Sequence, residues 1–414
     1  MSSKYALECD QFQANRTVSS GGIEMKSKCV PSISAERDIW NLPTSELGSL
    51  KIIGIGEISH NSGGLHAAAG KAILELIKKA EVNTLLFEVP SGAVISINQK
   101  IQNGEKLVER DLEGLYSVWR SHQVLDFFNS LAKFNRETNR KVSVFGVDVR
   151  QPYYEASKVR EFLSNGNSRL EFKLLELLPG EGDMVSFREF EQELIIGKRT
   201  LSESSVNEGV TLLSKVKNLI ANADLAPEVR FETEVAVQSL MSWFRMYGEA
   251  SKDQRMGYIM RDQGMADKTV ALLEARGGPI VVWTHLAHLL YNSPKASSSN
   301  SYVKYGKVLG TLLKEKYKEG FSTLAVGAQT LSIGGRGEEV TTFKTTADSL
   351  ESMVVGENPF GGWIRMSDTK GKSVEIARTK DLDDPKKVSF AHYRLRGDEQ
   401  FSYFLVVREA LEKK

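Results

Sequence analysis

The stretch Lys51-Ile52-Ile53-Gly54-Ile55-Gly56-Glu57-Ile58-Ser59-His60 decides the fold class. Its first half is a short β-branched apolar run closed by glycines, which is typical of a buried strand. Apolar residues then recur over 65–80 at the spacing of an amphipathic helix, and residues 84–89 form a second apolar run before Pro90. Strand, helix and strand make a βαβ unit, so the sequence predicts an α/β fold with a mainly parallel central sheet and flanking helices.

The rest of the chain extends this unit around a long helical segment. Apolar runs predict further strands at 142–148, 279–283 and 322–326, and a helix at 122–138. The long stretch between the third and fourth strands is charged and has helical spacing throughout. The predicted division is an irregular N-terminal leader at 1–48, a first α/β half at 49–153, a large helical insertion at 154–276 and a second α/β half at 277–414.

Composition excludes several classes of protein. The 414 residues carry 54 Lys plus Arg against 53 Asp plus Glu, so the chain lacks the basic excess of a general nucleic-acid binder. It has no apolar run long enough for a membrane span and no secretory signal pattern, so we expect a cytoplasmic protein that binds neither membranes nor nucleic acid. Cys9 and Cys29 lie in the leader without a nearby His, which argues against a zinc site. The expected partner is a small-molecule or peptide substrate, and the oligomeric state stays open.

Polar side chains follow the predicted strands where each strand ends. Because the carboxyl ends of parallel strands share one edge of a sheet, these residues can converge although more than two hundred positions separate them. Each alone has an ordinary structural explanation, such as a helix cap or a turn, but together they supply the acids and bases that catalysis near neutral pH needs. The candidates are Glu57, His60, Glu88, Asp148, His285 and His288.

Two common enzyme signatures are missing. The chain contains no G-x-S-x-G, so the usual serine-hydrolase elbow is absent. Gly54 and Gly56 follow a strand, but Glu57 to His60 come next instead of a third glycine opening a helix, which makes a dinucleotide site a weak interpretation.

Several motifs, in order from about residue 50 to 330, resemble those of the erythromycin esterase family. They are Gly56-Glu57-Ile58-Ser59-His60, Phe87-Glu88, Trp119-Arg120 with Phe134-Asn135, Phe145-Gly146-Val147-Asp148, Arg261-Asp262-Gln263-Gly264-Met265-Ala266, Val282-Trp283-Thr284-His285-Leu286-Ala287-His288 and Val308-Leu309-Gly310. The resemblance extends to a wider superfamily that includes proteins similar to Tiki proteases and haem-uptake factors. It implies an α/β fold with a helical insertion and a deep cleft.

The resemblance also implies roles for the candidate residues. His60 would be the general base that activates water to open an ester or lactone, and Glu57 would orient it. Glu88, His285 and His288 would complete the catalytic set. One of the two later histidines would donate to the oxyanion.

The residues that follow the catalytic set on the first predicted helix differ from the family pattern. Gly64 and Ala69 stand where the family has an acidic residue and an arginine, and Lys71 is the nearest cation. We therefore expect a substrate other than erythromycin, with shortened side chains leaving room for it. The expected substrate-binding residues are Asp148, Arg150, Lys71, His122, Arg261 and Trp283.

Other functions stay open. A metal-dependent enzyme would hold a divalent cation with Glu57, His60, Glu88 and His288, although the hydrolytic interpretation requires no cofactor. A non-hydrolytic enzyme of the same fold could act on a peptide or biosynthetic intermediate. A non-catalytic protein could use the same cleft to bind a small molecule or a tetrapyrrole.

Overall fold

The computed structural model describes residues 39–164, 166–178, 184–298, 303, 306–334, 340–369, 371–379 and 392–411. Cys9, Cys29 and most of the predicted leader lie outside these residues. The end of the leader is not irregular: Ile39, Trp40 and Leu42 are buried, and α2 (Thr44–Leu47) follows them. The packed part of the chain therefore begins before residue 49.

A central sheet organises the described chain, with strand order β3-β2-β4-β1-β6-β11-β8 and β7 beside β6. The strands that run parallel are β1 (Ile52–Glu57), β2 (Thr84–Pro90), β3 (Ser143–Asp148), β4 (Ile280–His285), β6 (Phe321–Ile333) and β11 (Tyr403–Ala410). Antiparallel strands β7 (Thr341–Lys344) and β8 (Gly361–Arg365) join them. The prediction of an α/β fold with a mainly parallel sheet is confirmed.

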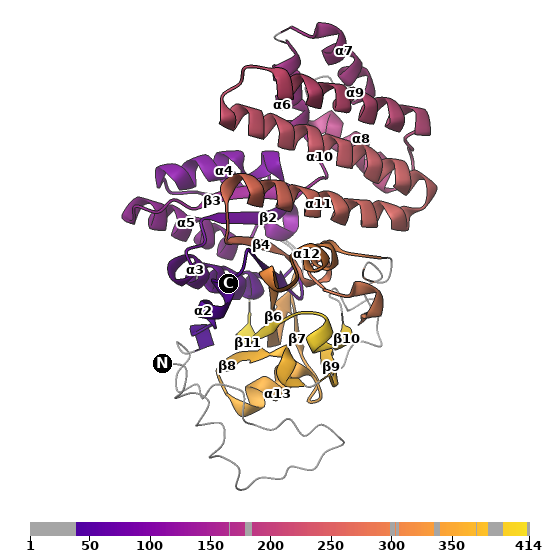
Figure 1. Ribbon diagram of the computed structural model, residues 1–414. Coiled ribbons are helices and arrows are strands. Elements are labelled where there is room, and N and C mark those ends of the chain that lie inside the picture. Colours follow the sequence, from indigo (N-terminus) through magenta and orange to yellow (C-terminus); the bar gives the residue numbers. More distant parts are fainter. Residues whose placement is uncertain are drawn as a thin grey trace.

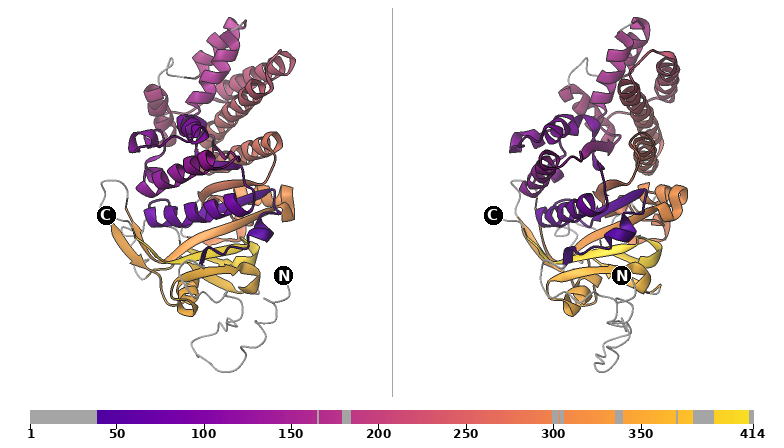
Figure 2. Two further views of the ribbon diagram at one scale, coloured as in Figure 1. Left: turned by 90° about the vertical axis from the view of Figure 1, so that its left-hand side faces the viewer. Right: turned by 60° about the vertical axis from the view of Figure 1, so that its left-hand side comes forward.

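Helices cover both faces of this sheet (Figures 1 and 2). On one face lie α3 (Gly63–Lys79), α4 (Ser91–Asn103) and α5 (His122–Glu137), and on the other lie α11 (Gln254–Arg276) and α12 (Leu309–Tyr317). The alternation along β1 explains this arrangement: Ile53 and Ile55 pack with the first group, whereas Ile52 packs with the second. Each buried isoleucine contributes about 1.5–3 kcal/mol, which makes this short strand a strong determinant of the fold.

The helical insertion packs around a core of its own and stands beyond the β3 end of the sheet (Figure 1). Besides α11 it contains α6 (Tyr153–Ser164), α7 (Ser168–Leu177), α8 (Met184–Ile195), α9 (Glu203–Asn222) and α10 (Pro227–Lys252). Trp243 lies at the centre of this core, in contact with Phe187 and Tyr247. The last helix, α11, belongs to both parts, because its Met265 and Leu272 pack on the sheet.

A buried ion pair joins two helices of the insertion, and the same lysine donates a hydrogen bond to α4 on the sheet. Lys268 of α11 donates from Nζ to Glu155 Oε1 of α6 (3.1 Å) and to Ser91 Oγ at the start of α4 (2.5 Å). Both charged side chains are 2% exposed. Lys268 therefore links α11 to both α6 and α4.

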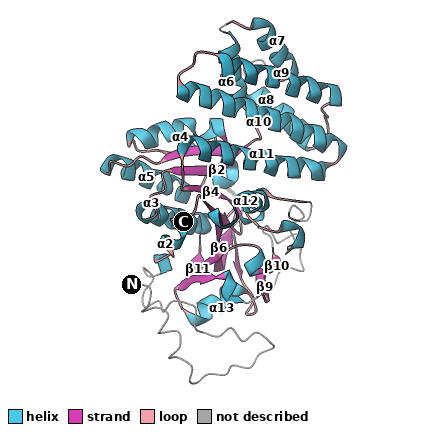
Figure 3. Cartoon of the chain, viewed as in Figure 1, coloured by secondary structure: helices cyan, strands magenta, loops and turns pink. Residues whose placement is uncertain are grey.

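The C-terminal region adds α13 (Leu350–Glu357) and a small antiparallel sheet of β5 (Ser297–Ser298), β10 (Tyr393–Arg396) and β9 (Ser373–Ile376). Figure 3 shows helices gathered at one end of the molecule and strands at the other. Within the described ranges, no helix has both the length and the apolar character that crossing a membrane requires.

Candidate active site

The carboxyl ends of the parallel strands bring the predicted polar residues together. Glu57 at the end of β1 lies beside His285 at the end of β4. The main-chain N–H of His285 donates to Glu88 Oε2 (2.9 Å), which joins the end of β4 to the end of β2. Asp148 ends β3. A sheet edge therefore assembles residues from the ends of four strands that are far apart in the sequence.

Glu57 and His60 form a hydrogen-bonded pair at this edge. His60 Nδ1 lies 3.0 Å from Glu57 Oε1, and Trp283 donates from Nε1 to Glu57 Oε2 (2.5 Å). Glu57 is fully buried, and burial raises its pKa even though the bonds from His60 and Trp283 favour the carboxylate. The His60 side chain is 23% exposed, with Nε2 at 3.5 Å from Glu88 Oε2. Its ring therefore lies between the two carboxylates, with Nδ1 toward Glu57 and Nε2 toward Glu88, and is the more exposed partner in both contacts.

His285 is fixed as a neutral hydrogen-bond donor. Its Nδ1 accepts the main-chain N–H of Ala287 (3.1 Å), at the start of the short 3-10 helix Leu286–His288. Burial, together with repulsion from His60 when that ring is protonated, lowers the pKa of His285 to about 3. A neutral ring that accepts at Nδ1 carries its proton on Nε2, and we assign this tautomer. The ring centroids of His285 and His60 are 4.8 Å apart, and the His285 ring also contacts the main chain of Ile58, a hydrogen bond that favours its protonated form.

Arg261 of α11 ties two strand ends together. Its Nη2 lies 3.0 Å from Glu88 Oε1 and 2.6 Å from Asp148 Oδ2, and its Nε lies 3.0 Å from Asp148 Oδ1. Although burial opposes ionisation, Arg261 lowers the pKa of Asp148 to about 2. Burial also raises the pKa of Glu88. The neighbouring His288, His60 and Arg261 outweigh this effect and hold the pKa well below its ordinary value. Both carboxylates are therefore ionised at neutral pH.

His288 differs from His285 in charge and in contacts. Its Nδ1 lies 2.7 Å from Asp262 Oδ1 and its Nε2 lies 3.1 Å from Glu88 Oε1. Burial disfavours the imidazolium, but the two carboxylates outweigh it and raise the pKa of His288 to about 10. Both nitrogens face carboxylates, and Arg261 Nη1 also lies 3.2 Å from Nε2, so His288 is held between Asp262, Glu88 and Arg261.

The charge on His288 predicts a loss of stability in alkali. Its folded-state pKa of about 10 lies above the ordinary 6.5. The stability it contributes is fully present below pH 6.5 and is lost as the pH rises through about 10. Denaturant titrations between pH 6 and 10 should show a fall in the free energy of unfolding that is steeper in wild type than in His288→Gln. Equal slopes in the two proteins would contradict the assigned imidazolium.

The predicted substrate-binding residues separate into two groups. Trp283 is fully buried and holds Glu57, and Arg150 lies over the ring of Tyr116 at 5.7 Å, two residues after Asp148. Lys71 instead lies over the ring of Trp40 (4.2 Å), and His122 is 74% exposed beside Glu109. The structure does not bring Lys71 or His122 into the cluster.

The small residues of α3 open no space for a substrate. A Cβ at Gly64 would fall 2.2 Å from the main-chain carbon of Ala410 in β11, so that strand fills the position. Ala69 is fully buried in the core. The expectation that shortened side chains leave room here is wrong, because neighbouring backbone and side chains occupy it.

Several residues of the cluster were not anticipated from the sequence. Asp262 holds His288, Tyr116 donates to Asp148 Oδ2 (2.9 Å), and the buried ring of Trp119 lies 4.9 Å from that of His60. Asp262 follows Arg261 in one of the quoted motifs. That position beside a predicted site residue could have marked Asp262 as a candidate. Trp119 likewise belongs to a quoted motif, with Arg120, whereas Tyr116 lies outside both the strand ends and the motifs.

The four residues proposed as metal ligands do not fit that role in this arrangement. His288 Nδ1 lies 2.7 Å from Asp262 Oδ1 and Nε2 lies 3.1 Å from Glu88 Oε1, so neither ring nitrogen faces an open coordination position. Across the described residues, no group of three or more His, Cys, Asp or Glu side chains is arranged to hold a metal ion. We therefore derive no chemical step through a metal.

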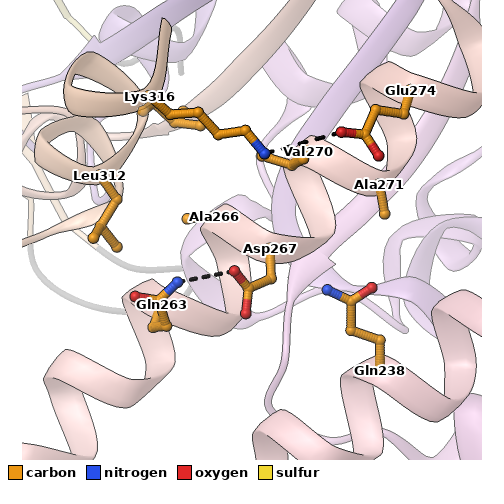
Figure 4. A pocket seen from close by; sticks show the side chains of 10 residues that line it. Gln238, Gln263, Ala266, Asp267, Val270, Ala271, Glu274, Leu312 and Lys316 are labelled. Atoms are coloured by element: carbon orange, nitrogen blue, oxygen red, sulfur yellow. Dashed lines mark hydrogen bonds and ion pairs between the residues drawn. The ribbon is translucent and has the colours of Figure 1, made fainter.

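A separate groove lies between α10, α11 and α12, with a volume of about 270 Å³ (Figure 4). Gln263 donates to Asp267 (2.9 Å) and Lys316 pairs with Glu274 (3.9 Å) across its wall. None of the residues that line it belongs to the strand-end cluster. The groove and the cluster are thus two different places on α11.

Known structures share this fold. A Bacillus cereus protein is 16% identical with a TM-score of 0.73, over 93% of this chain and 96% of that chain. A succinoglycan biosynthesis protein is 14% identical with a TM-score of 0.66, over 92% and 98%. A mutant of the erythromycin esterase EreC, in its open conformation, is 16% identical with a TM-score of 0.63, over 89% and 93%. At such identities the likeness shows the fold alone.

The sequence comparisons differ in outcome. A search of the curated proteins gave no match. The family model described as erythromycin esterase matches residues 77–383, which is well over half of the chain and includes Glu88, Asp148, Arg261, His285 and His288. The chain therefore belongs to the erythromycin esterase family.

Proposed function

We propose that this protein is a hydrolase that opens a carboxylic ester or lactone with a water molecule activated by His60. The observation that carries the proposal is the pairing of His60 Nδ1 with a buried glutamate (3.0 Å) beside a neutral histidine donor. Membership of the erythromycin esterase family supports hydrolysis in general. The ester class and the step-by-step mechanism are our proposal.

In this mechanism His60 acts first as base and then as acid. Its Nε2 takes a proton from water as the oxygen attacks the ester carbonyl, while Glu57 holds Nδ1–H and favours the imidazolium that forms. The carbonyl oxygen becomes an oxyanion and accepts a hydrogen bond from His285 Nε2–H. The imidazolium then returns the proton to the leaving alkoxide as the C–O bond breaks. Glu88 stays ionised throughout and, at 3.5 Å from Nε2, also stabilises the charged ring.

Removing the donor of His285 should slow the chemistry without weakening binding. Asparagine at this position can still accept the Ala287 N–H, as His285 Nδ1 does, but it lacks the Nε2 donor. For His285→Asn we expect kcat to fall by ~10²–10³-fold with KM little changed. Steady-state kinetics on an ester that wild type hydrolyses would check this. A rise in KM at unchanged kcat would mean that His285 binds substrate and takes no part in the transition state.

The functional test is a panel of esters and lactones. Purified protein would be incubated with p-nitrophenyl butyrate, small aliphatic lactones and 14-membered macrolides including erythromycin, and products would be examined by mass for the gain of one water. We expect turnover of at least one ester, with macrolides weak or unchanged because the family's charged residues are missing at Gly64 and Ala69. His392→Gln serves as a control, since His392 pairs with Glu375 beside the small sheet. If every ester stayed intact, or if His60→Gln matched wild type, the proposal would fail.

A further inference from the structure

His66 is a buried titratable side chain that the proposed mechanism does not use. It lies near the start of α3, six residues after His60, and is 1% exposed. Its Nδ1 lies 3.0 Å from Ser121 Oγ, the residue that caps α5 by accepting the N–H of Val124. Its Nε2 is buried without a hydrogen-bond partner among the described residues.

An unpartnered ring nitrogen is costly in this position. Leaving a buried polar atom unsatisfied costs about 1–3 kcal/mol, and an apolar ring of similar shape would avoid that cost. In native structures such groups call for an explanation, and a catalytic site is one place where they occur. The location of His66 within the cluster supplies that explanation.

His66 shares its main neighbour with the proposed base. Its ring stacks on the indole of Trp119, with centroids 4.9 Å apart and planes at 26°. The ring of His60 meets the same indole edge-on, also at 4.9 Å. Trp119 in turn contacts Trp283 (5.3 Å), which donates to Glu57. The indole is thus the common support of both members of the Glu57–His60 pair, and His66 lies against its face.

The ring of His66 is neutral in these surroundings. Burial and the charge of His60 lower its pKa to about 3, although the main chain of His60 favours the protonated form. The His60 main chain is thus near enough to act on this ring, but it does not meet the geometry of a hydrogen bond to Nε2. His66 therefore contacts the Trp119 indole, which packs against His60, and lies near the main chain of His60.

We propose that His66 is a positioning residue for His60, a role that rests on the proposed function. It holds the Trp119 indole and the His60 main chain so that His60 keeps Nδ1 on Glu57 and presents Nε2 to the attacking water. Displacement of a reacting group by about 1 Å can lower a rate by ~10²-fold, so a small loosening here has a large kinetic effect.

The variant His66→Phe separates this role from a purely structural one. Phenylalanine keeps an aromatic ring on Trp119 and removes the unsatisfied nitrogen, but it loses the contacts with Ser121 and with the main chain of His60. If His66 only fills space, the variant should be as stable and as active as wild type. If it positions His60, the variant should keep its melting temperature and lose kcat.

The experiment compares wild type, His66→Phe, His66→Gln and the control His392→Phe. Melting temperature, kcat and KM for p-nitrophenyl butyrate would be measured. Spectra of protein labelled at histidine ¹³Cε1 would be recorded at one pH, with the His60 signal assigned from His60→Gln. For His66→Phe we expect a melting temperature within about 2 °C of wild type, kcat lowered by ~10–100-fold, unchanged KM and a displaced His60 signal. Glutamine loses the stacked ring, but its amide can restore a polar contact with the His60 main chain and should recover part of kcat.

Two results would overturn the inference. One is an unchanged kcat and an unchanged His60 signal in His66→Phe. The other is a loss of activity that follows the loss of stability equally in the Phe and Gln variants. If wild type does not hydrolyse the ester, the proposed function is in question while the spectra still decide the inference: a His60 signal displaced in His66→Phe but not in His392→Phe supports it, and an undisplaced signal contradicts it.

Discussion

Replacing His60 with glutamine is expected to lower kcat on the hydrolysed ester by ~10²–10⁴-fold while the protein stays folded. Glutamine cannot take a proton from water, and the side chain is 23% exposed, so little packing is lost. Glu57→Gln should cause a loss of similar order, because it removes the carboxylate that holds Nδ1 and favours the imidazolium. Circular dichroism and melting temperature would confirm the fold, and steady-state kinetics would give the rates.

The control for both variants is His392→Gln, which removes a histidine–glutamate pair outside the cluster. Its kcat should match that of wild type. Wild-type turnover by either His60→Gln or Glu57→Gln would show that another group activates the water, and the proposed mechanism would then be wrong.

The second large effect is on stability. For Arg261→Met we expect a loss of ~3–5 kcal/mol in the free energy of unfolding, because removing one partner leaves the buried carboxylates of Asp148 and Glu88 without their guanidinium. The loss should shrink as the pH falls from 7 toward 4, since protonation of those carboxyls removes the unpaired charge. Denaturant unfolding at several pH values would measure both effects.

A matched control lies on the same helix. Arg255 pairs with Asp253, but its side chain is 65% exposed, so Arg255→Met should cost only ~0–1 kcal/mol. Equal losses in the free energy of unfolding would show that the buried Arg261 pairs stabilise the protein no more than the exposed Arg255 pair does. A loss in Arg261→Met that did not depend on pH would point to lost packing instead of unpaired charge.

The sheet was predictable because several of its strands are short apolar runs that end near a glycine or a proline. The runs at 51–56, 84–89 and 142–148 became β1, β2 and β3 within a residue or two. Outside these runs the sequence was less informative. The helix α4 begins Ser91-Gly92-Ala93, which is a weak helical start, and β11 and β8 are fixed by pairing with distant strands. Local pattern does not contain such long-range pairing.

The candidate site was predictable to the same extent as the strands that carry it. Residues at strand ends converge because parallel strands end at one edge, and this rule placed Glu57, Glu88, Asp148 and His285. Lys71 and His122 lie on helices, where the direction of a side chain depends on packing that the sequence does not show. The contrast between a neutral His285 and a charged His288 also needed the structure, because it depends on Asp262 of a distant helix.

The central claim is that water activated by His60 attacks the ester carbonyl directly. Its most direct test is a single turnover in H₂¹⁸O, with enzyme in excess over the ester that the panel identifies, followed by mass analysis of both products. The mechanism predicts one ¹⁸O in every molecule of acid and none in the alcohol, with no product from His60→Gln. Unlabelled acid in the first turnover, with ¹⁸O appearing in an enzyme carboxyl such as that of Glu88, would show that the protein itself is the nucleophile and would contradict the account.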